Sequence, residues 1–291
     1  MHKAGFVNII GNPNVGKSTL MNALVCEKLS IITSKAQTTR HRIMGIVNGE
    51  DFQIIYSDTP GILQPAYNLQ EFMRKSARGA LVDADIILFV VDVTVKPETD
   101  PEFLKKLKAA KIPVLLLLNK IDLSTEETVK KIADAWSGMM PQAEIIAVSA
   151  TERFNLDKIF NRIMDLLPEC PPYYQKDALT DKSERFFTAE IIREKILMNY
   201  HREVPYSVEI EIESFEATEA LIRIRAIIYV ARDSQKGIII GHKGASLKKT
   251  GTEARKDMED FLGKKVYLEL LVRVKKDWRN DITQLKQFGY R

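Results

Sequence analysis

Apolar residues in the first 170 positions of this 291-residue chain fall into short, almost unbroken runs that alternate with helix-forming stretches. The runs IILFVV (86–91) and VLLLL (114–118) are typical of strands buried between two layers of helices. This alternation predicts an α/β fold, with a mostly parallel sheet, helices on both faces and ligands at the carboxyl ends of the strands. The expected strands are residues 6–10, 85–92, 113–119 and 144–149, and the expected helices are residues 20–25, 69–81, 101–110, 126–138 and 156–167.

Two further β-rich runs, 43–47 and 52–56, flank the dipeptide Asn48-Gly49. Asn-Gly between two such runs is a strong hairpin signal, so we expect this pair of strands to be antiparallel. Residues 30–42, before the hairpin, are polar and without period, and they predict a mobile loop.

A different pattern begins after residue 170. Pro168, Pro171 and Pro172 interrupt the periodicity and polar residues follow to position 183. We therefore expect one domain at 1–170, a short stiff linker at 171–183 and a second domain at 184–291. In the second domain the predicted order is a helix at 183–199, strands at 208–212 and 221–230, a Gly-His-Lys-Gly turn and basic helix within 236–250, a strand at 265–272 and a helix at 274–288. This order predicts an α+β domain.

Composition narrows the function class. Apolar residues make up 45% and no apolar run is long enough to span a membrane, so we expect a protein without a transmembrane segment. The two cysteines have no metal-ligand spacing, which favours a reducing, cytoplasmic setting. Residues 1–170 carry 20 basic and 20 acidic side chains, so the net charge of +4 lies entirely in 171–291. This asymmetry indicates either a polyanionic partner for the second domain or simply a solvated basic helix.

The string GNPNVGKST follows the first predicted strand and opens the first predicted helix. In that context it is a phosphate-binding loop, because its glycines let backbone N–H groups face one anion while the helix start adds positive potential. The lysine would reach the outer phosphates and the serine hydroxyl would hold Mg²⁺. The candidate nucleotide-binding residues here are Gly11, Asn12, Pro13, Asn14, Val15, Gly16, Lys17, Ser18 and Thr19.

Polar residues also end three later strands of the same sheet. Asp58 and Gly61, in the string DTPG, suit a metal's outer shell and a γ-phosphate sensor. Asn119, Lys120 and Asp122 follow a later strand, and the Asp122 carboxylate can accept from guanine N1–H and N2–H₂, a donor pair that adenine lacks. An ATP-dependent kinase or helicase is therefore disfavoured. The next strand is followed by Ser149, Ala150 and Thr151, which would place a backbone N–H near the guanine carbonyl.

These motifs resemble small GTPases of the translation-factor-related class. The resemblance implies that a loop threonine completes the Mg²⁺ site when GTP is bound, and motif position favours Thr39 over Thr38. Lys17, Thr39 and Gly61 are then the catalytic candidates, and Ser18, Thr39 and Asp58 the metal candidates. Many members place a glutamine after the last glycine of the DTPG string, whereas this chain has Ile62, so we expect slow intrinsic hydrolysis. The group that completes the site is then one of three: a partner, a reorganised loop or a monovalent cation. Asn14 is typical of relatives that recruit potassium, so K⁺ is the candidate cation.

The Gly-His-Lys-Gly turn fits a second type of site. A G-x-x-G loop between two helices clamps about four backbone nucleotides of single-stranded RNA in KH domains. The predicted order of helices and strands fits the type II KH topology. The candidate RNA-binding residues are Ile238, Ile239, Ile240, Gly241, His242, Lys243, Gly244, Lys248, Lys275 and Lys276. Trp278 is expected either to pack on the domain or to stack on a base.

A GTPase domain joined to a KH domain resembles the Era family of bacterial GTPases, and the resemblance extends through SERFFTAEIIREKI, GIIIGHKG and VKKDWRND. It implies binding to the 3′ end of small-subunit ribosomal RNA during 30S maturation, with weak peripheral association at the inner membrane. We expect the protein to be a monomer. The leading hypothesis is a nucleotide-gated RNA chaperone. Its rival is a constitutive RNA-binding or scaffold protein in which GTP only stabilises the first domain.

Overall fold

The computed structural model describes residues 1–290 except 34, 36, 63 and 97–99, and it divides into two compact units. Unit 1 comprises Met1–Pro65 and Gln70–Asp181, and unit 2 comprises Ala66–Leu69 and Lys182–Arg291. Two positions of the loop expected at 30–42 therefore lie outside the described residues, and the others form neither helix nor strand. Within the described part of the chain, no helix combines the length and the apolar content needed to span a bilayer.

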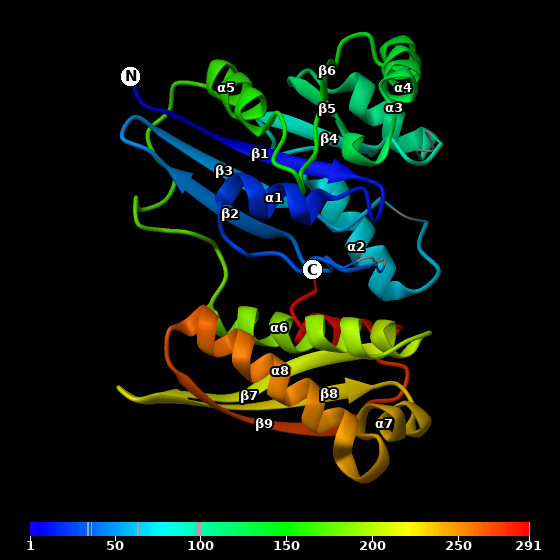
Figure 1. Ribbon diagram of the computed structural model, residues 1–291, viewed down its shortest axis with the longest axis vertical. Helices are drawn as coiled ribbons and strands as arrows, with labels where there is room; N and C mark the ends of the chain where they lie inside the picture. The colour runs from blue at the N-terminus through cyan, green and yellow to red at the C-terminus, as the bar shows by residue number, and fades with distance from the viewer. Residues whose placement is uncertain (34, 36, 63, 97–99, 291) are drawn as a thin grey trace. The chain divides into compact units, whose positions relative to one another are not determined.

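Unit 1 is built on a six-stranded sheet in the order β2-β3-β1-β4-β5-β6 (Figure 1). Its strands are β1 (Lys3–Gly11), β2 (Ile43–Asn48), β3 (Phe52–Asp58), β4 (Ile86–Asp92), β5 (Val114–Asn119) and β6 (Glu144–Ala147). All neighbouring pairs are parallel except β2 and β3, which form the predicted antiparallel hairpin. The prediction of a mostly parallel sheet is confirmed.

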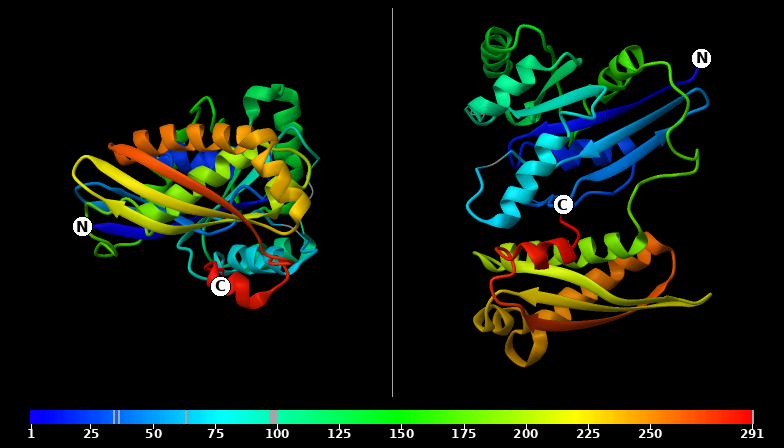
Figure 2. Two further views of the ribbon diagram at one scale, coloured as in Figure 1. Left: turned by 90° about the horizontal axis from the view of Figure 1, so that it is seen from below. Right: turned by 180° about the vertical axis from the view of Figure 1, so that it is seen from behind.

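Helices cover both faces of this sheet. They are α1 (Lys17–Val25), α2 (Asn68–Gly79), α3 (Pro101–Ala109), α4 (Glu126–Met139) and α5 (Leu156–Leu166), with a short 3₁₀ turn η1 (Ile121–Leu123) after β5. Figures 1 and 2 show α1 and α5 on one face and α2, α3 and α4 on the other. Every residue of β4 and β5 is buried, because helices enclose these central strands on both sides.

Local signals fix where several of these helices begin. The side chain of Asp100 caps α3 by accepting hydrogen bonds from the backbone N–H groups of Glu102 and Phe103, and Pro101 occupies the first helical position. Thr125 caps α4 in the same way through the N–H of Thr128. These caps satisfy backbone donors that helices leave unpaired at their first turn.

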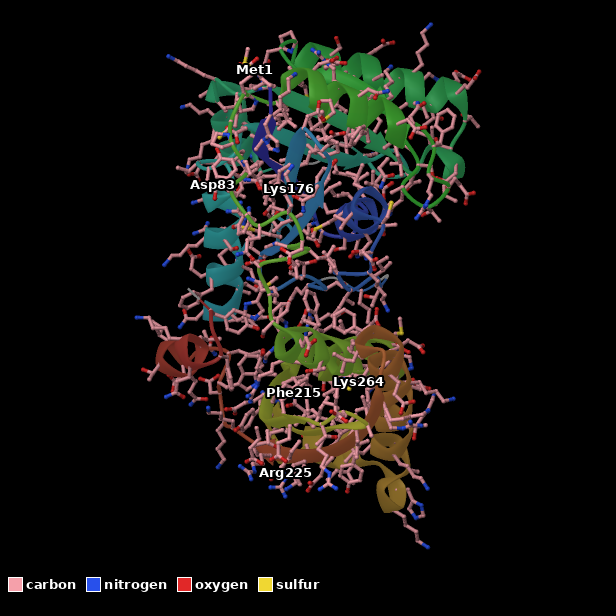
Figure 3. The ribbon with its side chains drawn as sticks, turned by 90° about the vertical axis from the view of Figure 1, so that its left-hand side faces the viewer. Met1, Asp83, Lys176, Phe215, Arg225 and Lys264 are labelled. Carbon is pink, nitrogen blue, oxygen red and sulfur yellow. The ribbon has the colours of Figure 1, made fainter. Side chains whose placement is uncertain are left out.

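The segment expected as a linker, 171–183, is for most of its length part of unit 1. The Gln53 side chain accepts from the N–H groups of Tyr173 and Tyr174, at 2.7 and 2.9 Å. Lys176 Nζ donates to the carbonyl of Gly49 in the hairpin turn, at 2.7 Å (Figure 3). Further along, Thr180 forms a β-bridge to β2, so the chain leaves unit 1 only after residue 181.

Unit 2 has the predicted order of helix, two strands, two helices and a strand. The elements are α6 (Glu184–Asn199), η2 (Val204–Ser207), β7 (Val208–Ala217), β8 (Leu221–Val230), α7 (Asp233–Ile240), η3 (His242–Gly244), α8 (Ala245–Leu262), β9 (Lys265–Val274) and α9 (Ile282–Gln287). The sheet order is β7-β8-β9, with β7 antiparallel and β9 parallel to β8. Helices α6 and α8 bury Ile192, Ile196, Ala254 and Met258 against one face.

The opposite face of this sheet carries charged side chains, such as Arg225 (Figure 3). Arg225 donates to Glu269 on the neighbouring strand at 3.0 Å, while the alternate residues Ile224 and Ala226 are buried in the core. Exposed charged residues and buried apolar residues therefore alternate along this part of β8.

The helix predicted over 274–288 is wrong for its first half. Strand β9 continues to Val274, a turn follows, and only Ile282–Gln287 is helical. Trp278 explains the difference, because its ring is fully buried and its Nε1–H donates to the Ser207 carbonyl at 3.0 Å. Packing of one aromatic residue overrides the helical composition of the segment, and Trp278 packs rather than stacks on a base.

Candidate nucleotide and RNA sites

The phosphate loop joins β1 to α1 through a turn that requires glycine at Gly16. Gly16 has φ +97°, and a Cβ at this position would lie 2.3 Å from the Asn119 side-chain nitrogen. A larger residue would therefore be strained in its backbone and would displace Asn119. The turn aligns the first N–H groups of α1, which is the arrangement that binds a phosphate.

Lys17, the first residue of α1, is buried beneath this loop. Its Nζ donates to the carbonyl oxygens of Gly11 and Asn12, at 3.1 and 2.8 Å. Burial lowers the pKa of Lys17 to about 8, and the nearby Asp58 carboxylate opposes that shift. A phosphate placed against the loop would also favour the charged ammonium, because opposite charges stabilise one another in a poorly solvated site.

Three oxygen-bearing side chains meet at the end of β3. Asp58 Oδ2 accepts from Ser18 Oγ at 2.6 Å and from Thr39 Oγ1 at 3.0 Å, and the two hydroxyl oxygens are 2.9 Å apart. Burial raises the pKa of Asp58, whereas Lys17 and the two hydroxyls lower it. Oxygen atoms of hydroxyl and carboxylate groups are the ligands that Mg²⁺ prefers, so these three side chains fit the expected ion.

The neighbouring threonine is directed elsewhere. Thr38 Oγ1 donates to the Lys35 carbonyl at 2.6 Å and lies 3.0 Å from Thr33 Oγ1. Of the two threonines left open by the sequence, Thr39 is therefore the one placed beside Ser18 and Asp58.

Asn119 holds the guanine motifs to the phosphate loop. Its Nδ2 donates to the Val15 carbonyl at 2.8 Å, and its Oδ1 accepts from the Ala150 N–H at 3.0 Å. Ser149 is buried beside Ala150, and its hydroxyl accepts from the Glu152 N–H. Asp122 and Thr151 are exposed, as expected for side chains at the entrance of a ligand site.

A cavity of about 480 Å³ runs along the phosphate loop. Its lining residues are Pro13, Asn14, Gly16, Lys17, Ser18, Thr19, Ile31, Ile32, Thr33, Gln37, Thr38, Thr39, Gly61 and Lys120. Sequence reasoning missed the apolar wall formed by Ile31 and Ile32. The loop at 30–42 has no periodicity, so only the dipeptide itself, two aliphatic residues within a polar loop, could have indicated it.

The predicted RNA motif lies between α7 and α8 in unit 2. Gly241 and Gly244 have φ of +71° and +80°, and His242 and Lys243 are exposed between them. A cavity of about 350 Å³ begins at Gly244 and continues between α8 and the edge strand β9. It is lined by Gly244, Leu247, Lys248, Gly251, Thr252, Arg255, Leu268 and Leu270, and we call it the α8–β9 groove.

Three of the candidate RNA-binding residues, Ile238, Ile239 and Ile240, are not among the residues that line this groove. Ile239 is fully buried in the core of unit 2, so its side chain does not line the groove, and Ile240 packs partly against the same core. Ile238 is half exposed on α7. The floor comes instead from Leu247 on α8 and from Leu268 and Leu270 on β9.

Sequence reasoning also missed part of the polar wall, namely Thr252 and Arg255. The lining residues 244, 248, 251, 252 and 255 have the spacing of residues on one face of a helix. This helical spacing is the signal from which Thr252 and Arg255 could have been identified in the sequence. In the described part of the chain, Lys275 and Lys276 are not among the residues that line the α8–β9 groove. Lys275 lies over the rings of Tyr229 and Phe288, 5.1 and 4.5 Å from their centroids.

The two units thus define a P-loop GTPase domain and a KH domain in one chain. The family model for a 50S ribosome-binding GTPase matches residues 6–120, and the model for a KH domain matches residues 203–279. The chain belongs to the Era family of GTPases. It is 47% identical to GTPase Era of Geotalea daltonii over 289 residues, covering 99% of this chain and 97% of that protein. It is 48% identical to GTPase Era of Syntrophus aciditrophicus, with 100% and 96% covered.

Solved structures give the same result. An Era variant of Aquifex aeolicus bound to GDP·AlF₄⁻ matches with a TM-score of 0.94, 40% identity and 99% of each chain covered. An Era protein in complex with MgGDPNP and nucleotides 1506–1542 of 16S ribosomal RNA matches with a TM-score of 0.95, 39% identity and coverage of 100% of this chain and 99% of that chain. Membership of this family implies GTP hydrolysis.

Proposed function

We propose that this protein binds GTP and GDP with Mg²⁺, hydrolyses GTP slowly, and binds the single-stranded 3′ end of small-subunit ribosomal RNA to assist 30S subunit assembly in a nucleotide-dependent way. The observation that carries the proposal is the meeting of Ser18, Thr39 and Asp58 beside buried Lys17, in a chain that also holds a G-x-x-G groove. The Era structure that contains both MgGDPNP and 16S rRNA supports assigning the two ligands to the two units.

In the proposed reaction Lys17 would neutralise charge on the phosphates, while Thr39 and the backbone at Gly61 would sense the γ-phosphate. Mg²⁺, held by Ser18, Thr39 and Asp58, would act as a Lewis acid on the phosphate oxygens. Slow turnover follows from Ile62, whose side chain is buried in the core of unit 1 and cannot orient a water molecule. Potassium, recruited near Asn14, is the second proposed ion, and turnover measured in KCl and in NaCl tests it.

The route from nucleotide to RNA groove begins at β2. This strand starts four residues after Thr39, and its first residue, Ile43, is the register partner of Asp58. The last residues of unit 1 are hydrogen-bonded to the same strand. Thr180 Oγ1 donates to the Met44 carbonyl at 2.6 Å, and the Asp181 side chain accepts from the Met44 N–H at 3.0 Å. Ordering of the loop around Thr39 by Mg²⁺ and GTP would therefore act, through β2, on the chain that enters unit 2.

RNA affinity decides between this gating function and its rival. Binding of a single-stranded 16S rRNA 3′ fragment is measured with a GTP analogue, with GDP and without nucleotide. We expect affinities that differ between the states, and Thr180→Val should reduce the difference without altering GTP affinity. Equal affinities in all three states would leave only the constitutive RNA-binding protein.

Three further properties are proposed from the sequence and the family resemblance. They are a cytoplasmic location, weak peripheral association with the inner membrane and a monomeric state. Cosedimentation with anionic vesicles tests the membrane association, and analytical ultracentrifugation tests the monomer.

A further inference from the structure

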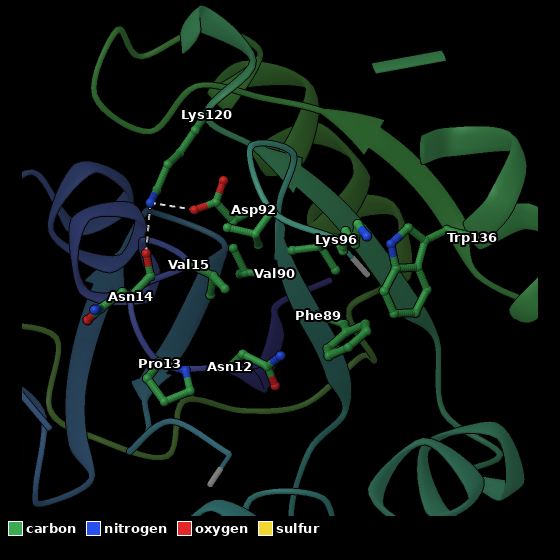
Figure 4. A pocket seen from close by; sticks show the side chains of 12 residues that line it. Asn12, Pro13, Asn14, Val15, Phe89, Val90, Asp92, Lys96, Lys120 and Trp136 are labelled. Atoms are coloured by element: carbon green, nitrogen blue, oxygen red, sulfur yellow. Dashed lines mark hydrogen bonds and ion pairs between the residues drawn. The ribbon is translucent and has the colours of Figure 1, made fainter. Parts of the chain in front are cut away.

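Lys120 lines two cavities that both border the phosphate loop. It lines the 480 Å³ cavity along the loop, and also a second cavity of about 620 Å³ bounded by residues of the loop, β4 and α4. Its Nζ donates to the Asn14 carbonyl at 2.8 Å and to Asp92 Oδ2 at 2.6 Å (Figure 4). Lys120 therefore borders the nucleotide side, and its ammonium group is anchored on both the loop and β4.

The orientation of Asp92 is fixed independently of Lys120. Its other oxygen, Oδ1, accepts from the Thr94 N–H at 2.8 Å and from Thr94 Oγ1 at 2.7 Å. Asp92 ends β4 directly beside Asn119 in the parallel register, and the Val93 N–H donates to the Asn119 carbonyl at 3.1 Å. One carboxylate oxygen is thus held by its own turn, and the other points at the neighbouring strand.

The environment makes this ion pair stronger than a surface pair. The Asp92 side chain is 8% exposed, and the Lys120 side chain 30% exposed. Burial alone would raise the pKa of Asp92, but hydrogen bonds from Lys120 and Thr94 hold the pKa below its usual value. Hydrogen bonds to a charged, partly desolvated group contribute more than those between neutral groups.

We propose that Asp92 is a positioning residue for guanine-nucleotide binding: it holds the Lys120 ammonium against the Asn14 carbonyl, so that Lys120 keeps a fixed place in the wall of the nucleotide site. Asp92 is among the residues that line the 620 Å³ cavity and not among those that line the 480 Å³ cavity, so it acts through Lys120. This inference rests on the nucleotide binding proposed above.

A double-mutant cycle on nucleotide release tests the inference. Dissociation of a fluorescent GDP analogue is followed in the full-length protein and in the variants Asp92→Asn, Lys120→Met and Asp92→Asn/Lys120→Met. Loss of one charged hydrogen bond predicts that Asp92→Asn accelerates release about tenfold. Because Asp92 acts through Lys120, adding Asp92→Asn to Lys120→Met should change the rate by less than about twofold.

The control is Glu102→Gln, which removes an exposed ion pair with Arg78 in the same unit and should leave release unchanged. Asparagine keeps the shape of Asp92 and can still accept from Thr94, so the variant is expected to fold, which a thermal melt checks. The inference would be overturned if the two substitutions had independent effects, so that their factors on the release rate multiplied in the double variant. A normal release rate in Asp92→Asn would also overturn it. If the unmodified protein bound no guanine nucleotide, the proposed function itself would fail.

Discussion

Replacing Gly16 by alanine tests whether the shape of the phosphate loop is fixed by steric contact with the guanine motif. Gly16 has φ +97°, and the added methyl carbon would lie 2.3 Å from Asn119 Nδ2. Alanine must therefore adopt a left-handed conformation and push Asn119 away. Asn119 would then lose its hydrogen bonds to the Val15 carbonyl and the Ala150 N–H.

The cost can be worked from these contacts. A left-handed backbone costs alanine roughly 1–2 kcal/mol, and each of the two lost hydrogen bonds contributes about 1 kcal/mol. We therefore expect Gly16→Ala to destabilise unit 1 by about 3–4 kcal/mol. Gly138→Ala is the matched control, because Gly138 lies exposed in α4 with no atom within 4 Å of the added carbon. It should instead stabilise the helix, by up to about 1 kcal/mol.

Urea unfolding of the nucleotide-free protein measures both effects. The chain has two tryptophans, Trp136 in unit 1 and Trp278 in unit 2, so a Trp278→Phe background leaves fluorescence that reports on unit 1 alone. With a slope of roughly 2 kcal/mol per molar urea, Gly16→Ala should lower the midpoint by roughly 1.5–2 M. Equal midpoints for Gly16→Ala and Gly138→Ala would refute the steric argument.

Three other substitutions test separate parts of the two sites. Asp122→Asn should shift nucleotide preference from guanine toward xanthine, measured by competition, and an unchanged preference would contradict the guanine assignment. Gly244→Asp should weaken RNA binding at least tenfold and leave GTP affinity unchanged, because the added carboxylate repels phosphate. The control is Gly263→Asp, which also replaces a positive-φ glycine with open space around it and should bind RNA normally. Thr39→Ala should weaken the Mg²⁺ dependence of GTP analogue binding, measured by titration after chelation, and Thr38→Ala should have little effect; the reverse order would move the metal role to Thr38.

The fold of unit 1 could be predicted from the sequence because its central strands are buried on both faces. All residues of β4 and β5 before the last one are therefore apolar, and each strand reads as a continuous apolar run that ends at a polar residue. The polar residues that end these strands, Asp92 and Asn119, therefore lie in the region of the candidate nucleotide site. The candidate nucleotide residues follow from local strings, which short-range sequence reasoning detects well.

The packing of the linker on unit 1 and the point where the last helix begins could not be predicted, because long-range contacts determine both. Gln53 lies 120 residues before Tyr173, yet its amide holds the backbone of the presumed linker on unit 1. Trp278 donates a hydrogen bond to the carbonyl of Ser207, 71 residues earlier. This contact interrupts a segment whose composition alone favours a helix. Neither partner is visible in a local window of the sequence.

The RNA groove shows the same limit in a functional site. The G-x-x-G string locates the end of the groove, since Gly241 and Gly244 adopt positive φ angles that other residues resist. Its apolar floor, however, depends on which side of β9 faces α8, and this depends on the register between β8 and β9. Leu268 and Leu270 are inward residues of that register, whereas Ile239 of the aliphatic run 238–240 is buried in the core. A motif therefore identifies where backbone must approach a ligand, while the side chains that contact the ligand are chosen by packing from elsewhere in the chain.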